Sequence, residues 1–257
     1  MQRVRDLVVR VEAAHPTDDF LSVAMDNLST SRTARAHYKA YDRALSVMDT
    51  VSLEKLYHKA ISHFTDHRRG QLKQGFFNQL NDCFAYRHLI NQGCKDVAIL
   101  DEGKSTQPDI FCTSGGAEYF CEVKTIGISD EEAGRRGSGL AFTAKYHELS
   151  EGFFRKLNHD IEQANAQIKS RGPNGLVFIV VTFDDFSTTY YQDHRRQLRK
   201  FLESHLAKNI YIKAGIVGTR CVSNCRLSAW DANEVYLPQE VLLVSTHLAS
   251  RQINAIR

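Results

Sequence analysis

The spacing of apolar residues divides the chain into a helical first part and a mixed second part. In residues 3–11 and 52–61, apolar and charged side chains alternate at roughly helical intervals, and residues 29–33 form a polar break between the two runs. We therefore expect a helical N-terminal region over residues 1–70, either a small subdomain or a cap on the second part of the chain. A second domain is expected over residues 71–257.

The second part alternates helical patterns with short strand-like runs. Helices are expected at residues 76–90, 154–168 and 190–206, and strands at 97–100, 109–113, 117–125, 176–183, 210–219 and 241–245. The compact turn Ser114-Gly115-Gly116 predicts an antiparallel hairpin, and the long polar stretch 127–152 is typical of a functional or disordered loop. This order predicts an α/β (mixed α+β) fold, with one central mixed β-sheet flanked by helices.

Composition and charge exclude some classes of protein. Hydrophobic residues make up 42% and charged residues 25% of the chain, which are ordinary globular values. No apolar run approaches the roughly 20 residues of a membrane span, and the N-terminus has no apolar signal segment, so we expect a cytoplasmic protein. The net charge of +3 permits contact with a polyanion without requiring it. We expect the six cysteines to be reduced and buried.

The strand predicted at residues 117–125 carries the candidate chemistry. Side chains alternate between the faces of a strand, so Glu122 and Lys124 share one face. The preceding strand begins with Pro108-Asp109, and the hairpin can bring Asp109 next to Glu122. Two converging carboxylates suit Mg²⁺, which needs one or two protein carboxylates together with water and substrate phosphate. A lysine beside them suits the stabilisation of charge on a reacting phosphate.

These residues resemble the motif of the PD-(D/E)-x-K nucleases, the restriction-endonuclease-like superfamily. Pro108-Asp109 matches the first half of the motif and Glu122-Val123-Lys124 the second, over a resemblance that covers residues 75–185. The resemblance implies a restriction-endonuclease-like core and a nuclease that hydrolyses phosphodiester bonds, with DNA and endonucleolytic cleavage expected. It also implies Mg²⁺ (or Mn²⁺) held by Asp109, Glu122 and the Val123 carbonyl, with Lys124 beside the attacking water. Asp109, Glu122 and Lys124 are thus the expected catalytic residues.

The motif is short, and a second Glu-x-Lys occurs at Glu102-Gly103-Lys104. That copy lies in a polar, glycine-containing turn that holds neither side chain on a sheet face, so we favour the copy at residues 122–124. The alternative for the favoured copy is a solvated ion pair on an edge strand, with Asp109 capping a turn.

Four further residues are candidate accessory groups. Many proteins of this superfamily carry a glutamate on the helix before the first core strand, and this chain has none from residue 75 to 93. On that helix Asp82 is a candidate outer metal ligand and Gln79 a candidate for holding water. Gln163 and Gln167 lie on the polar stripe of the helix at residues 154–168, where the resemblance implies a position beside the site. Plain solvated helix surface is the alternative for each.

Basic residues on the helix at residues 190–206 are the candidate nucleic-acid contacts. They are Arg195, Arg196, Arg199 and Lys200. Such side chains supply sequence-independent affinity for phosphate, although a solvated face is the alternative. Two other functions stay open from the sequence: a non-catalytic nucleic-acid-binding module, and a protein-interaction module that uses the helical N-terminal region to form a homodimer or to bind a partner protein.

Overall fold

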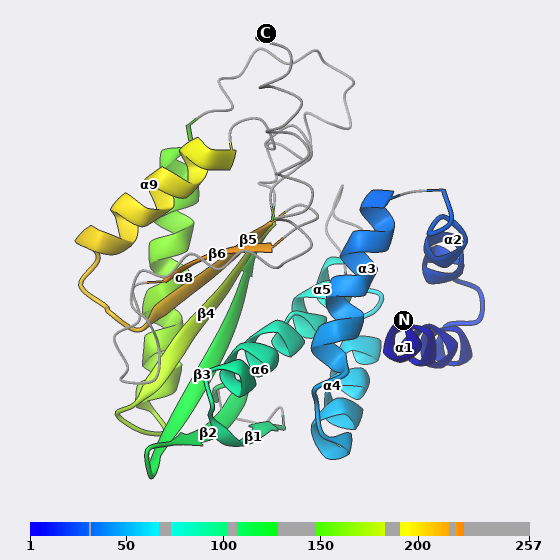
Figure 1. Ribbon diagram of the computed structural model, residues 1–257, viewed down its shortest axis with the longest axis horizontal. Helices are drawn as coiled ribbons and strands as arrows, with labels where there is room; N and C mark the ends of the chain where they lie inside the picture. Colours follow the sequence, from blue (N-terminus) through cyan, green and yellow to red (C-terminus); the bar gives the residue numbers. More distant parts are fainter. Residues whose placement is uncertain are drawn as a thin grey trace, which may run out of the picture.

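The chain folds into a mixed α/β structure with one sheet (Figure 1). The computed structural model describes residues 1–30, 32–66, 73–101, 107–127, 148–182, 191–215 and 219–223. Its helices are α1 (Gln2–Ala14), α2 (Phe20–Asp26), α3 (Arg32–Leu45), α4 (Thr50–Ser62), α5 (Gln74–Leu80), α6 (Asp82–Asn91), α8 (Glu151–Lys169) and α9 (Tyr191–Ser204). Its strands are β1 (Lys95–Ile99), β2 (Ile110–Ser114), β3 (Ala117–Ile126), β4 (Gly175–Thr182), β5 (Ile210–Gly215) and β6 (Thr219–Ser223).

The six strands lie in the sheet in sequence order. The pairs β1–β2, β2–β3 and β5–β6 are antiparallel, whereas β3–β4 and β4–β5 are parallel. Between β2 and β3, Gly115 and Gly116 have φ of 58° and 82°, a conformation that side chains other than glycine rarely adopt. The expected hairpin and the expected mixed sheet are therefore confirmed.

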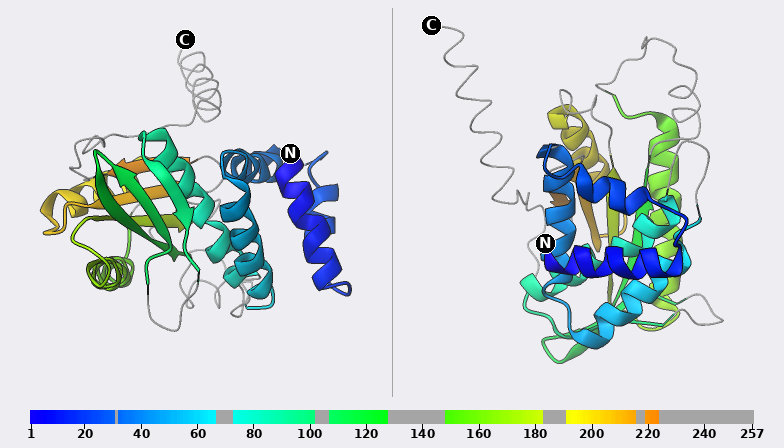
Figure 2. Two further views of the ribbon diagram at one scale, coloured as in Figure 1. Left: turned by 90° about the horizontal axis from the view of Figure 1, so that it is seen from below. Right: turned by 90° about the vertical axis from the view of Figure 1, so that its right-hand side faces the viewer.

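Helices cover both faces of the sheet (Figure 2). On one face, α8 and α9 bury a cluster that includes Leu157, Ile161 and Leu198 together with Val177 and Ile179 of β4. On the other face, a larger cluster joins apolar residues of β1–β5 to α6 and to the N-terminal helices. The expected helical N-terminal region is thus confirmed as helical, and its core residues belong to the same cluster as one face of the sheet.

The predicted helix over residues 76–90 is interrupted at Asn81. The structure has two helices there, α5 and α6, because the N–H of Phe84 donates to the carbonyl of Asn81 in a tight three-residue turn. The buried Asn81 side chain accepts a hydrogen bond from Tyr41 Oη (2.7 Å) and donates one to Thr125 Oγ1 (3.0 Å). This residue therefore ties the start of α6 to the end of β3.

The close packing of α8 on the sheet depends on Gly175, the first residue of β4. A Cβ atom at this position would lie 2.4 Å from Ile168 Cγ2 and 2.4 Å from the carbonyl oxygen of Phe120. The missing side chain lets the last turns of α8 approach the β3–β4 pair. At the other end, the Ser150 side chain accepts the N–H of Phe153 and caps the helix.

Some expectations fall outside the part of the chain described by the structure. These are the strand at residues 241–245, most of the polar stretch 127–152, the Glu102-Gly103-Lys104 copy of the motif and Cys225. The expected strand at residues 210–219 ends at Gly215, and the chain pairs back through β6, a strand that the sequence pattern did not predict. No helix in the described ranges has both the length and the apolar character needed to cross a membrane. Four cysteines are buried thiols, as expected: Cys83, Cys94, Cys112 and Cys121.

Candidate active site

Asp109 lies directly before β2, where the hairpin pairing ends. Its N–H donates to the carbonyl of Cys121 (3.1 Å), the residue of β3 that also pairs with Ile110. Beyond this point the side chain of Asp109, and not its backbone, contacts β3, because Oδ2 accepts the N–H of Val123 (2.9 Å). The Asp109 carboxylate is thereby fixed against β3, in the position that the hairpin prediction required.

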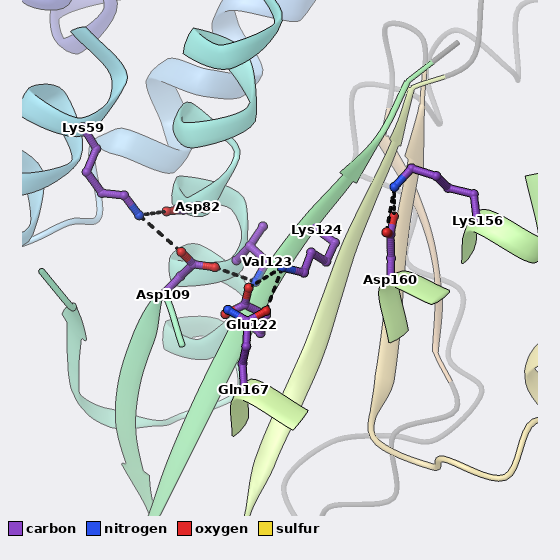
Figure 3. Close-up of polar contacts among 9 residues, drawn as sticks. All are labelled: Lys59, Asp82, Asp109, Glu122, Val123, Lys124, Lys156, Asp160 and Gln167. Carbon is purple, nitrogen blue, oxygen red and sulfur yellow. Dashed lines mark hydrogen bonds and ion pairs between the residues drawn. The ribbon is translucent and has the colours of Figure 1, made fainter. Parts of the chain in front are cut away.

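Glu122 and Lys124 project from the same face of β3, as the alternation of side chains predicts. The ammonium of Lys124 donates to Glu122 Oε1 (2.7 Å) and to Gln167 Oε1 of α8 (2.9 Å) (Figure 3). The Glu122 side chain is only 4% exposed, whereas that of Lys124 is 23% exposed. The alternative of a solvated surface pair on an edge strand is wrong, because β3 lies inside the sheet and Glu122 is buried.

The second carboxylate oxygen of Glu122 is the exceptional atom of the site. Oε2 is buried and has no hydrogen-bond partner among the residues that the structure describes. Burial, and next the charge of Asp109, raise the pKa of Glu122 to about 8, while Lys124 opposes this rise. A buried carboxylate oxygen without a donor is costly in a folded protein, and it is the kind of atom that a cation satisfies.

Asp82 is the first residue of α6 and belongs to the same cluster of charges. The side chain is buried, so the alternative of plain solvated surface is wrong for this residue. Burial raises its pKa well above the usual range; Asp109 and Glu122 add to this rise, and Lys59 opposes it. The charge of Asp109 therefore acts on both Asp82 and Glu122.

Lys59 of α4 is the site residue that the sequence analysis missed. Its ammonium lies 3.2 Å from Asp82 Oδ2 and 3.2 Å from Asp109 Oδ1 (Figure 3). Burial alone would lower the pKa of Lys59, but the two carboxylates outweigh it and raise the pKa. A signal was present in the sequence: Lys59 follows Ser52 and Leu56 on the buried stripe of its helix, and a lysine on such a stripe needs a partner.

The other candidate residues separate into those near the site and those away from it. Gln167 contacts Lys124, whereas Gln163, one turn earlier on α8, is exposed. Gln79 on α5 is half-buried and forms no side-chain hydrogen bond to Asp109, Glu122 or Lys124 in the described structure. Of the two glutamines proposed on α8, only Gln167 therefore belongs to the cluster.

The helix α9, which carries the basic residues, packs together with α8 on one face of the sheet (Figure 2). Arg195 and Arg199 are half-buried, and Lys200 is exposed. Arg196 is largely exposed and pairs with Asp193 of the same helix. The helix that carries these four residues thus covers the face of the sheet opposite to α6. Their part in nucleic-acid binding stays a prediction.

The donor set suits a hard divalent cation. In the described residues, no group of three or more His, Cys, Asp or Glu side chains is arranged to hold a metal, and Asp82 is paired with Lys59. Asp109 and Glu122 remain as candidate carboxylate ligands. The carbonyl of Val123 points to the same edge of β3 as that of Cys121, since residues two apart in a strand face the same neighbour. Two carboxylates and a carbonyl, with Glu122 Oε2 lacking a donor, fit Mg²⁺ or Mn²⁺.

Comparison with known proteins gives no family for this chain. No family model, no curated protein and no solved structure matches it. The function is therefore inferred from the arrangement of the residues themselves.

Proposed function

We propose that this protein is a divalent-metal-dependent nuclease with a restriction-endonuclease-like core, and that it hydrolyses phosphodiester bonds in nucleic acid, with DNA the expected substrate. The observation that carries the proposal is the buried, donor-free Oε2 of Glu122, with the Asp109 carboxylate near it and Lys124 on the same face of β3. The order of elements adds support: a helix, three antiparallel strands, a helix and a parallel strand surround these residues.

Each residue has a distinct part in the proposed reaction. Asp109, Glu122 and the Val123 carbonyl would hold the ion, which when bound polarises a phosphoryl oxygen and lowers the pKa of coordinated water. The Lys124 ammonium, part exposed, faces the side from which substrate arrives. It would orient the attacking water and offset the negative charge that builds up on the phosphate. Gln167 holds that ammonium in place through its amide oxygen.

The proposal is tested with Lys124→Ala in a cleavage assay with Mg²⁺ and plasmid or linear duplex DNA. Removing one preorganised charge from a reacting phosphate costs about a hundredfold or more in rate, so turnover should fall by at least that factor. Binding of DNA in Ca²⁺, which tolerates looser coordination, should persist. Cleavage should need Mg²⁺ or Mn²⁺ and stop with a chelator.

Lys156→Ala is the matched control. Lys156 forms a pair of the same length, 2.7 Å, with the buried Asp160 on α8, away from Lys124 (Figure 3). Both substitutions leave a buried carboxylate without its lysine, and each should cost about 1–3 kcal/mol of stability. Only Lys124→Ala should lose turnover. Equal cleavage by the two variants, or full activity in chelator, would refute the catalytic assignment. DNA binding by a wild-type protein that never cleaves with either metal would favour the non-catalytic binding module.

A further inference from the structure

The candidate site contains two lysines, and they lie on opposite sides of Asp109 and Glu122. Lys124 comes from β3 and is part exposed, whereas Lys59 comes from α4 in the helical N-terminal region and is 7% exposed. The ammonium of Lys59 bridges Asp82 Oδ2 and Asp109 Oδ1 at equal distances of 3.2 Å. In Figure 3 it reaches down from α4 between the two carboxylates.

We propose that Lys59 occupies, as a fixed cation of the protein, the position between Asp82 and Asp109 at which a second divalent ion would have to bind, so that the site takes a single metal ion. A divalent ion shared by these residues would use the carboxylate oxygens that the ammonium already contacts, at about 2.0–2.1 Å for Mg²⁺. The ammonium excludes such an ion by its volume and by its charge. The inference rests on the proposed function only for the nature of the ion at Asp109 and Glu122.

The formal charges of the cluster support one ion. When all groups are ionised, the three carboxylates Asp82, Asp109 and Glu122 and the two lysines leave a net charge of −1. One divalent ion brings the cluster to +1, and a substrate phosphodiester, with its single negative charge, then brings it to zero. A second divalent ion would leave an excess of two positive charges in a largely buried site, which is disfavoured at low dielectric.

The burial of Lys59 fixes this cation in place. Its neighbours Leu56 and Ala60 on α4 are fully buried in the cluster that also contains Val123 of β3. The helix therefore cannot move away from β3 without opening that core. Lys59 is a positioning residue in this arrangement: it holds Asp82 and Asp109, and it does not reach the side on which Lys124 is exposed.

The experiment is a titration of metal-free protein with Mn²⁺ alone at pH 8.5, in which the free ion is counted by electron paramagnetic resonance. Wild type and Lys59→Arg, which keeps the cation, should each bind one Mn²⁺. Lys59→Met leaves Asp82 and Asp109 without their cation and should bind two. Lys59→Met/Asp82→Asn removes the second site again and should return to one.

Two Mn²⁺ ions in wild type, or one in a folded Lys59→Met protein, would overturn the inference. If Lys59→Met folds only in the presence of Mn²⁺, the inference is supported, because the added ion then replaces the lost lysine. The number of Mn²⁺ ions bound by the wild-type protein decides the question in every case. Failure of the proposed function is distinguishable from failure of this inference. A protein that binds one Mn²⁺ but never cleaves nucleic acid keeps the inference and loses the function, whereas a nuclease that binds two ions keeps the function and loses the inference.

Discussion

Glu122 is the residue whose protonation would be coupled to the proposed binding of a metal ion. Its carboxyl group is buried, one oxygen pairs with Lys124, and the other has no donor in the described part of the chain. Burial first, and Asp109 second, raise its pKa from the ordinary value of 4.5 to about 8. Because the folded state holds this proton more tightly than the unfolded chain, its contribution to stability is present below about pH 4.5 and is lost as the pH rises through about 8.

We expect Mn²⁺ binding to release this proton. A ligand carboxylate must be ionised, so the ion competes with the proton below about pH 8, and the affinity should rise with pH up to that value and then level off. Titration calorimetry in buffers of different ionisation enthalpy should find about one proton released per ion at pH 7 and almost none at pH 9.5. No proton release at pH 7 would show that Glu122 is already ionised in the metal-free protein.

At the scale of elements, α8 positions the lysine of the motif. The helix approaches β3 closely because Gly175 has no side chain to keep Ile168 away. Gln167, the neighbour of Ile168, is thereby brought within 2.9 Å of Lys124. A glutamine at this position limits the directions in which the lysine ammonium can point. Residues that hydrogen-bond to metal ligands and reactive groups orient those groups in the same way.

Gln167→Ala should lower turnover by about tenfold, because residues that orient reactive groups from behind typically contribute 10- to 100-fold. The affinity for Mn²⁺ should change little, since Gln167 contacts Lys124 and not Glu122 or Asp109. Gln163→Ala, one turn earlier and exposed, is the control and should stay within about twofold of wild type. The comparison needs single-turnover rates together with melting temperatures. Equal rates for the two variants would mean that Lys124 is held by other groups.

Local sequence patterns predicted the strand part of the site and gave Asp82 and Gln167 as candidates on helices, but they did not point to Lys59. The alternation of side chains on β3 placed Glu122 and Lys124 on one face, and the Gly-Gly turn brought Asp109 to them. Asp82 and Lys59 meet across 23 residues of sequence, and Lys59 and Asp109 across 50. Such contacts depend on how α4 and α6 pack, which the spacing of residues within one helix does not determine. For the same reason the pattern left solvated helix surface open as an alternative for Asp82, although the residue is buried.

At the scale of the whole molecule, one hydrophobic core joins the N-terminal helices to the sheet. The larger cluster contains Leu7 of α1, Leu56 of α4, Cys83 of α6 and Val123 of β3. Residues on both sides of the boundary expected near residue 70 therefore pack into the same cluster. The arrangement explains how a lysine of α4 can be held beside a carboxylate at the end of a sheet strand. It also means that the chemistry proposed for β3 depends on helices far from it in sequence.

The continuity of this core predicts that the N-terminal helices and the sheet unfold together. Leu56 is fully buried, and Leu56→Ala should cost about 2–5 kcal/mol. In native-state hydrogen exchange, the slowest amides of α4 and of β3 should lose protection by the same amount, because a cooperative unit opens as a whole. Val51→Ala on the same helix, where the side chain is 66% exposed, is the control and should change stability by no more than about 0.5 kcal/mol.

A Leu56→Ala protein in which only α4 loses protection from hydrogen exchange, while β3 keeps the protection of wild type, would show that the N-terminal region is a separate folding unit. In that case Lys59 would be supplied to Asp109 by a docked subdomain, and the metal site would lose its second lysine whenever that subdomain opened.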